Sequence, residues 1–407
     1  MKLHRPKSLL IDSGAGWFDS GSYATAGIFG DPALTLCFSS DGTKVFSRSG
    51  EETFSEDPLG LVEKLAAEGY TALGYISYDY LSYTTPGVAT SDAKQREKLP
   101  FLFFHFYEED SFYTAPWDEV LSAFPRERAG PGPLPRSNIE REEYARKISA
   151  IKEHIAAGDV YQVNLSRKFR FKPLGEPLSW FLDFYRAQPV PFAAFIGFPG
   201  FELVSGSMEL FLRRRGDNIT TRPIKGTVRR DPDPRRDREL AEALGKKPKE
   251  RAENLMIVDL MRNDLGRICG YGSIGVRELF AVRSYSTLFQ MESEIEGRLR
   301  PGVGLSQIIA STFPPGSVTG APKREAIRII DSLEPHERGP YCGAICLFSP
   351  SGDFTMSVAI RTGVNSSEGA DFWFGGGIVW DSKADDEYGE TELKAKALTS
   401  IASRQVL

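Results

Sequence analysis

The sequence lacks the features that would place it in several large classes of protein. It has only four cysteines, with no CxxC pair and no His/Cys spacing suited to zinc. No stretch reaches the roughly 18 consecutive apolar residues that a membrane helix needs. The N-terminal "MKLHRPKSLLIDSG" also lacks the apolar run of a signal peptide. We therefore expect a cytoplasmic protein with reduced thiols and no membrane partner.

A strong excess of one charge is missing as well. The 50 basic and 55 acidic side chains give a formal net charge of -5, which offers no electrostatic reason to expect nucleic acid as a partner. Neither a GxxxxGK[ST] motif nor a GxGxxG between a strand and a helix occurs. The sequence therefore predicts no nucleic-acid partner and gives no support for nucleotide binding.

What is present is a long, folded chain rich in strand-forming residues. With 407 residues, of which 41% are hydrophobic and 12% aromatic, the chain can build a deep, buried site. We expect residues 1–125 to form a β-rich region that belongs to the same interleaved fold as a second region, 137–407, with the Pro/Gly-rich "FPRERAGPGPLPRS" at 124–137 between them. Strand-like runs occur in clusters and helices singly, without βαβ alternation. This pattern predicts an α+β fold.

Five helices and one polar strand stand out. Ser137 and Glu140 form a capping-box signature before a helix that Gly158 ends. The strand "VYQVNLSRKF" would place Gln162, Asn164 and Ser166 on one face, which either lines a cavity or is half-exposed in an antiparallel sheet. The other predicted helices span 57–69, 249–266, 320–334 and 383–403.

Lys225 is held in the constrained segment "TRPIKGT". Proline at 223 fixes a backbone torsion, and Gly226 lets the chain approach another group closely. A lysine that is desolvated, or close to other cations, loses affinity for its proton, and only the neutral amine is nucleophilic. Lys225 is therefore a candidate nucleophile; the alternative is a surface lysine at a strand edge.

Two pairs of glutamates have helical spacing. Glu250 and Glu253 begin one helix, and Glu387 and Glu390 begin another. If the pairs face each other, they provide the oxygen ligands that Mg²⁺ prefers. The alternative is a solvated helix surface, because Glu390 and Lys394 also have the spacing of an i,i+4 ion pair.

Several stretches together resemble the chorismate-binding enzymes, the family of anthranilate, isochorismate and aminodeoxychorismate synthases. The resemblance covers about residues 137–407. The motifs occur in the family's order: "GDVYQVNLS", "TRPIKGT", "ENLMIVDLMRNDLGR", "TFPPGSVTGAPK", "GPYCGAICLFS" and "FGGGIVWDS" with "EYGETELKAKAL". The family's fold implies two large, mostly antiparallel β-sheets packed as a sandwich with helices outside.

The resemblance also implies a reaction. Lysine in "PIKGT" is similar to the aminodeoxychorismate synthase branch, whereas anthranilate synthases typically have alanine there. Lys225 would attack chorismate at C2 to form a covalent adduct, and ammonia would then give 4-amino-4-deoxychorismate, a precursor of p-aminobenzoate and folate. Glu209 matches the general acid. The alternatives are anthranilate or isochorismate formation, and a non-catalytic chorismate-binding subunit.

The family motifs imply further roles around these two residues. Glu253 and Glu390 match Mg²⁺ ligands, and Glu250 and Glu387 match carboxylates that hold the waters of the ion. Ammonia would come from a separate glutamine amidotransferase subunit, because no glutaminase motif is visible here. The positions that match the grip on substrate carboxylates are Thr227, Tyr341, Arg361, Gly375, Gly376, Gly377 and Lys394.

Two positions depart from the family pattern. Met208 stands where the family usually has proline, just before Glu209. Gln290 stands where anthranilate synthases generally have histidine, which argues against that activity. The sequence gives no role for Gln290.

Overall fold

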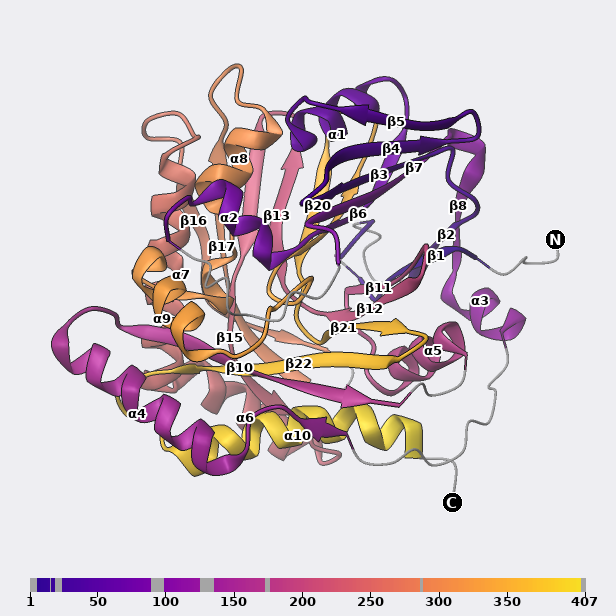
Figure 1. Ribbon diagram of the computed structural model, residues 1–407. Helices are drawn as coiled ribbons and strands as arrows, with labels where there is room; N and C mark the ends of the chain where they lie inside the picture. The colour runs from indigo at the N-terminus through magenta and orange to yellow at the C-terminus, as the bar shows by residue number, and fades with distance from the viewer. Residues whose placement is uncertain are drawn as a thin grey trace.

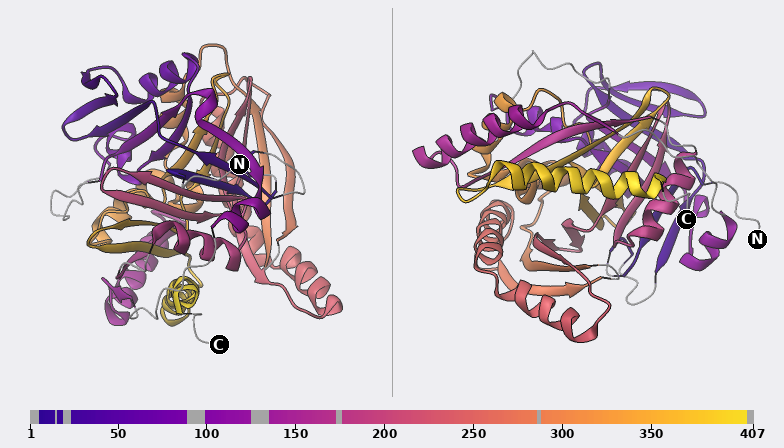
Figure 2. Two further views of the ribbon diagram at one scale, coloured as in Figure 1. Left: turned by 90° about the vertical axis from the view of Figure 1, so that its right-hand side faces the viewer. Right: turned by 90° about the horizontal axis from the view of Figure 1, so that it is seen from below.

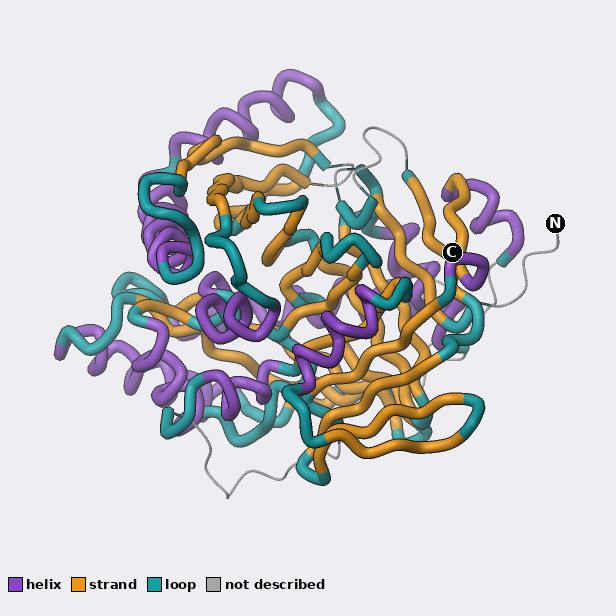
Figure 3. Tube along the Cα trace, turned by 90° about the horizontal axis from the view of Figure 1, so that it is seen from above, coloured by secondary structure: helices purple, strands orange, loops and turns teal. Residues whose placement is uncertain are grey.

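Two large antiparallel β-sheets form the centre of the protein (Figure 1). The computed structural model describes residues 6–14, 16–18, 24–88, 99–124, 135–172, 176–285 and 288–403. All pairings between the described strands are antiparallel. Strands fill the middle of the molecule and helices lie mainly outside them (Figure 3). The predicted α+β sandwich is confirmed.

The first sheet has ten strands. In spatial order they are β18 (Gly320–Ala321), β10 (Gln162–Phe171), β22 (Gly369–Ile378), β21 (Thr362–Ser366), β12 (Phe201–Ser207), β11 (Phe192–Phe198), β1 (Ser8–Asp12), β2 (Thr25–Phe29) and β8 (Phe112–Pro116), with β9 (Arg136–Ser137) also paired to β10.

The second sheet has twelve strands. In spatial order they are β15 (Ile224–Arg229), β17 (Leu288–Arg298), β14 (Asn218–Arg222), β13 (Leu210–Arg215), β20 (Phe354–Val358), β19 (Ala344–Phe348), β6 (Thr71–Ile76), β7 (Leu102–Tyr107), β3 (Leu34–Ser39), β4 (Gly42–Ser47) and β5 (Gly50–Phe54), with β16 (Gly275–Ser284) also paired to β17.

Helices cover the sheets from outside (Figures 1 and 2). The bounds are α1 (Pro58–Ala67), α2 (Leu81–Thr84), α3 (Trp117–Ala123), α4 (Arg141–Ala157), α5 (Pro177–Ala187), α6 (Pro234–Lys246), α7 (Pro248–Gly266), α8 (Leu305–Thr312), α9 (Lys323–Leu333) and α10 (Ala384–Ser403). α4, α5 and α10 contact the ten-stranded sheet, and α6 and α7 contact the β15–β17 end of the other. None of the described helices is both long and apolar enough to cross a membrane.

Alternation along β1 shows how the layers pack. Leu10 belongs to a core that also contains Tyr75 and Phe104 of the second sheet. Its neighbours Leu9 and Ile11 belong to a separate core under α5. The ten-stranded sheet is therefore buried on both faces, with the second sheet on one side and helices on the other.

The N-terminal region contributes to both sheets. β1, β2 and β8 join the first sheet, while β3 to β7 join the second. Strands from before and after the predicted boundary at 124–137 are therefore neighbours in the same sheets. Most of that boundary, 125–134, lies outside the described residues.

The predicted helices are confirmed as α1, α4, α7, α9 and α10, but the predicted capping box is wrong. α4 begins after Glu140, which has no side-chain capping bond, and Ser137 is paired in β9. The Ser137 hydroxyl bonds to the backbone of Ile139 instead. Gly158 ends α4 with a φ of 84°, as predicted.

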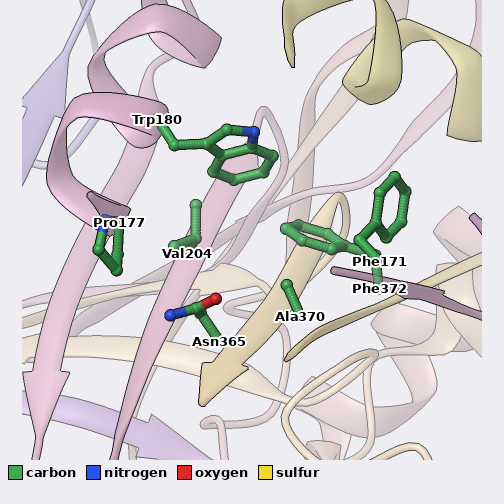
Figure 4. A pocket seen from close by; sticks show the side chains of 7 residues that line it. All are labelled: Phe171, Pro177, Trp180, Val204, Asn365, Ala370 and Phe372. Atoms are coloured by element: carbon green, nitrogen blue, oxygen red, sulfur yellow. The ribbon is translucent and has the colours of Figure 1, made fainter. Parts of the chain in front are cut away.

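The described residues that line a hollow between α5 and the first sheet include no charged side chain (Figure 4). Trp180 of α5 lies over it, with its ring 5.1 Å from that of Phe372. Phe171 and Val204 also line it. This lining does not suit a dicarboxylate ligand, so the candidate site lies elsewhere.

Candidate active site

Lys225 lies in a bulge at the β15 end of the twelve-stranded sheet. The register between β15 and β17 shifts between Ile224 and Thr227, where β15 has one extra residue. Gly226, in this bulge, has a φ of 83°. A Cβ there would lie 3.0 Å from a carboxylate oxygen of Glu250. Glycine is therefore needed both for the backbone conformation and for the close approach of Glu250.

The amine of Lys225 is buried among oxygen atoms. The side chain is 12% exposed. Nζ lies 3.3 Å from Oε1 of Gln162, 3.5 Å from the carbonyl oxygen of Ser317 and 4.0 Å from a carboxylate oxygen of Glu253. Burial lowers the pKa of Lys225, although the negative charge of Glu253 acts to raise it. The environment thus favours the neutral amine more than water does, as a nucleophile requires.

Glu209 lies between β12 and β13, directly before Leu210, and is 4% exposed. Burial raises the pKa of Glu209 to about 7. The Ser317 hydroxyl, the charge of Lys225 and the Ile224 backbone N–H, 3.5 Å away, act in the opposite direction. A carboxyl group that titrates near neutral pH can hold a proton and release it to a leaving group.

Ser317 connects these two groups, although the sequence did not identify it as a site residue. It lies in a 3-10 turn, Gly316–Val318. Its carbonyl oxygen accepts from Lys225, and its hydroxyl donates to Glu209. Ser317 belongs to the family motif "TFPPGSVTGAPK", but nothing in one sequence shows that this turn reaches the sheet ends.

The two predicted glutamate pairs belong to one electrostatic cluster. Burial raises the pKa of Glu253, and the charges of Glu250 and Glu387 raise it further. Burial also raises the pKa of Glu387, with Glu390 acting in the same direction. Carboxylates contributed by α7 and α10 therefore repel one another.

Lysines balance this acidic cluster. Lys249 lies 3.9 Å from Glu253, and Lys394 lies 2.7 Å from Glu390, so the predicted i,i+4 ion pair is also present. Within the described ranges, no group of three or more His, Cys, Asp or Glu side chains is close enough to hold a metal ion. The donor set nevertheless fits Mg²⁺ in its chemistry, since it consists of carboxylate oxygens whose repulsion a dication would relieve.

Arg361 has a guanidinium nitrogen that is buried in the described structure. The residue follows β20 with a φ of 50°, unusual for a side chain other than glycine. Burial lowers the pKa of Arg361 to about 10. In the described part of the chain, its Nη1 has no hydrogen-bond partner. An anionic ligand would satisfy this donor.

The three glycines of β22 leave room for polar side chains. They pair with Ser166, Leu165 and Asn164 of β10. A Cβ would lie 2.7 Å from Oδ1 of Asn164 at Gly375, 3.1 Å from Oε2 of Glu387 at Gly376, and 2.9 Å from Cδ of Gln162 at Gly377. The polar face of β10 is buried, so its half-exposed alternative is wrong.

The remaining predicted substrate-binding residues are Lys394, Tyr341 and Thr227. Lys394 donates to the carbonyl oxygen of Gly375 at 2.8 Å. Tyr341 is 4% exposed and its ring stacks on that of Trp373 at 6.3 Å. Thr227 is exposed on β15. Among the described residues, no hydrogen bond joins Tyr341 or Thr227 to Lys225.

The two departures from the family pattern contact each other. The side-chain amide of Gln290 contacts the sulfur of Met208, and both residues are buried. The amide oxygen of Gln290 has no partner in the described part of the chain. Met208 immediately precedes Glu209, so the contact links β17 to the segment that carries the candidate acid.

Comparison with known proteins gives relatives that are named for two different activities. The chain is 42% identical to anthranilate synthase component 1 1 of Haloarcula marismortui over 264 residues, which are 65% of this chain and 54% of that protein. It is 42% identical to aminodeoxychorismate synthase component 1 of Escherichia coli over 257 residues, 63% of this chain and 56% of that protein. The chain spans about half the length of these curated relatives.

The fold and the family comparison agree. The structure matches the crystal structure of anthranilate synthase component I from Streptococcus pneumoniae with a TM-score of 0.82 and 26% identity, covering 92% of both chains. The family described as chorismate binding enzyme matches residues 14–400. These findings confirm the resemblance carried by the motifs: the chain belongs to the chorismate-binding enzymes.

Proposed function

We propose that this chain aminates chorismate at C4 to give 4-amino-4-deoxychorismate, acting as component I of an aminodeoxychorismate synthase. The observation that carries the proposal is the buried amine of Lys225, linked through Ser317 to Glu209. The group pairs a candidate nucleophile with an acid whose pKa is about 7. This is the combination that replacement of a hydroxyl group by an amine requires.

The reaction proceeds by two displacements. The neutral Lys225 amine bonds to C2 of the ring, the two ring double bonds shift, and the C4 hydroxyl leaves as water with a proton from Glu209. Ammonia then bonds to C4, the double bonds shift back, and the C2–N bond breaks to release Lys225. Protons lost by the two nitrogen nucleophiles return to Glu209 and the departing lysine. The net change is chorismate plus ammonia giving the amine plus water.

The rest of the site holds the substrate carboxylates. Arg361 offers a buried donor that has no partner among the described residues, and a planar guanidinium can bind a carboxylate through two hydrogen bonds. The backbone of Gly375–Gly377, together with Lys394, Tyr341 and Thr227, completes the proposed grip. Glu253 and Glu390 would hold Mg²⁺, with Glu250 and Glu387 on its waters. The ion would supply positive charge to neutralise the ring carboxylate.

The ammonia would come from a separate glutamine amidotransferase. The product would serve the formation of p-aminobenzoate and folate. Free ammonium should replace the partner, because the proposed chemistry of this chain needs only ammonia.

Product analysis tests the proposal. The purified chain is incubated with chorismate, Mg²⁺ and an ammonium salt, and the products are separated and identified by mass. The expected product is 4-amino-4-deoxychorismate without release of pyruvate. Anthranilate and pyruvate as the main products would contradict the assignment.

Anthranilate formation is the second candidate, favoured by the relatives of that name at equal identity. Amination at C2 needs that face of the ring to be open to ammonia. A Lys225 amine bonded to C2 would block it. Metal dependence is a separate test: Glu253→Gln, Glu390→Gln or EDTA should abolish turnover, and full activity in metal-free buffer would exclude the Mg²⁺ assignment.

A further inference from the structure

Gln162 is fully buried although its side chain is polar. It is 0% exposed and lies at the end of β10 where this strand pairs with β18. Its side chain fills the space that the missing Cβ of Gly377 leaves. A side-chain amide so completely removed from water needs partners for both of its ends.

The two ends of this amide have different environments. Oε1 accepts a hydrogen bond from Nζ of Lys225 at 3.3 Å. Nε2 is buried and has no partner within the described ranges. A Cβ at Gly377 would lie 3.1 Å from Nε2, so the donor lies against the glycine run of β22.

We infer that Gln162 is a positioning residue with two functions: its amide oxygen holds the Lys225 amine, and its amide N–H donates to a carboxylate oxygen of the bound substrate. The inference rests on the proposed function, since it needs Lys225 as the nucleophile. A buried donor without a partner is costly until a ligand supplies an acceptor. Substrate binding would therefore complete the hydrogen bonding of Gln162.

The position of Gln162 suits this role because it connects the two sheets. Lys225 belongs to the twelve-stranded sheet, and Gln162 belongs to the ten-stranded sheet (Figure 1). β10 has neighbours on both sides in the sheet, so its backbone is well fixed. One amide thus sets the nucleophile of one sheet relative to a ligand on the other. Neither Ser317, through a backbone carbonyl, nor Glu253, which has no amide N–H, can form both contacts.

Two variants of Gln162 and one control variant test the two ends of the amide. Gln162→Leu removes the acceptor and the donor at similar size, and Gln162→Glu keeps an acceptor while it removes the donor. Gln307→Leu is the matched control, since Gln307 is exposed on α8. For each variant we would measure chorismate binding at equilibrium without ammonia. The rate of covalent adduct formation is followed by intact mass, and the thermal unfolding midpoint is recorded.

Gln162→Leu should bind chorismate about tenfold more weakly, as expected for one lost hydrogen bond to a charged group. It should form adduct about a hundredfold more slowly because the amine is misplaced. Gln162→Glu should weaken binding at least as much, and it provides the binding test if the leucine variant does not fold. Unchanged binding and adduct rate in a folded variant would overturn the inference. A merely structural role would change only the unfolding midpoint.

Failure of this inference can be distinguished from failure of the proposed function. If wild type forms the adduct and Gln162→Leu forms it equally fast and binds equally well, only the inference is wrong. If wild type aminates chorismate without any adduct, the nucleophile assignment fails and the function of the amide oxygen fails with it. Chorismate binding is then compared between Lys225→Ala and the double variant Lys225→Ala/Gln162→Leu. A roughly tenfold weaker affinity of the double variant supports the amide N–H of Gln162 as a donor to the substrate, and equal affinity refutes it.

Discussion

Two buried clusters of charge in this protein differ in how completely their groups are paired. In the first, Glu334 and Arg338 are 2% and 1% exposed. Arg338 donates to both oxygens of Glu334 and to the carbonyl oxygens of Asn164 and Val318. Glu334 also accepts from the backbone and hydroxyl of Ser166. The hydrogen-bonding groups of this pair have partners within the protein.

The second cluster, at the candidate site, is also largely buried, but it is incompletely paired. Glu209 is 4% exposed, three oxygens around the Lys225 amine lie at 3.3 to 4.0 Å, and Arg361 has a nitrogen without a partner among the described residues. The pKa values express the difference. Burial acts to raise the pKa of both glutamates, but Arg338 lowers that of Glu334 to about 2, whereas that of Glu209 reaches about 7. A fully hydrogen-bonded pair such as Glu334 and Arg338 suits a structural role. Incompletely paired groups such as Glu209 and Lys225 suit a catalytic role.

The largest expected effect is on turnover, from Lys225→Ala. Amination should fall by at least about ten-thousandfold, on the scale of other removed nucleophiles. The free energy of unfolding should not fall much, because the variant removes an incompletely paired buried charge. Product formation and urea unfolding measure the two effects. Lys246→Ala, an exposed helix lysine, is the control. Wild-type amination by Lys225→Ala would show that the lysine is structural.

Glu209→Gln should lower turnover by roughly a thousandfold, within the range for a removed general acid. The amide keeps the size of the side chain but cannot release a proton to the leaving hydroxyl. Steady-state rates at saturating chorismate give the measurement. Glu239→Gln, on the exposed side of α6, is the matched control. Equal rates for both variants would remove Glu209 from the mechanism.

Glu334→Gln should destabilise the fold by about 3 to 5 kcal/mol, because it leaves Arg338 buried without its counter-charge. Urea unfolding gives the loss. The control is Glu325→Gln, also in or beside α9, where the ion pair with Arg328 is on the surface and should contribute less than about 1 kcal/mol. If both variants lose the same free energy of unfolding, the fully paired Glu334 contributes no more to stability than a surface ion pair does.

The smallest effect is the pH dependence of stability, which has opposite signs in the two clusters. The pKa of Glu209 is raised from its ordinary 4.5 to about 7, so its stabilising contribution is present below about pH 4.5 and lost as the pH rises through 7. The pKa of Glu334 is lowered to about 2. The stability that Glu334 contributes is therefore present above pH 4.5 and lost as the pH falls toward 2. From pH 5 to 8, wild type should lose about 2 to 3 kcal/mol relative to Glu209→Gln. If the free energies of unfolding of wild type and Glu209→Gln change in parallel with pH, the pKa of Glu209 is not raised.

The sequence predicted the elements and most of the chemistry because these depend on local patterns and family motifs. Helical spacing found α7 and α10 with their glutamates, and "TRPIKGT" identified Lys225. The capping box failed because Ser137 is held in β9 by pairing with β10, and this tertiary contact outweighs the local signal.

Contacts between segments distant in the sequence were not predictable in the same way. Ser317 and Gln162 reach Lys225 from a turn and from the other sheet, 92 and 63 residues away. The contact between Met208 and Gln290 joins two positions that the sequence could identify only as separate departures. Motif order gives residue identities, but the packing of the two sheets decides which residues meet.

The most direct test of the central claim, that the incompletely paired Lys225 is the nucleophile, is to trap its adduct. Wild-type protein is mixed with chorismate and Mg²⁺ without ammonia, quenched and digested, and the peptide that contains Lys225 is examined by mass spectrometry. The account predicts an increase equal to the mass of chorismate less water, lost again when ammonium is added and 4-amino-4-deoxychorismate forms. An unmodified Lys225 in a sample that aminates chorismate once ammonium is supplied would contradict it.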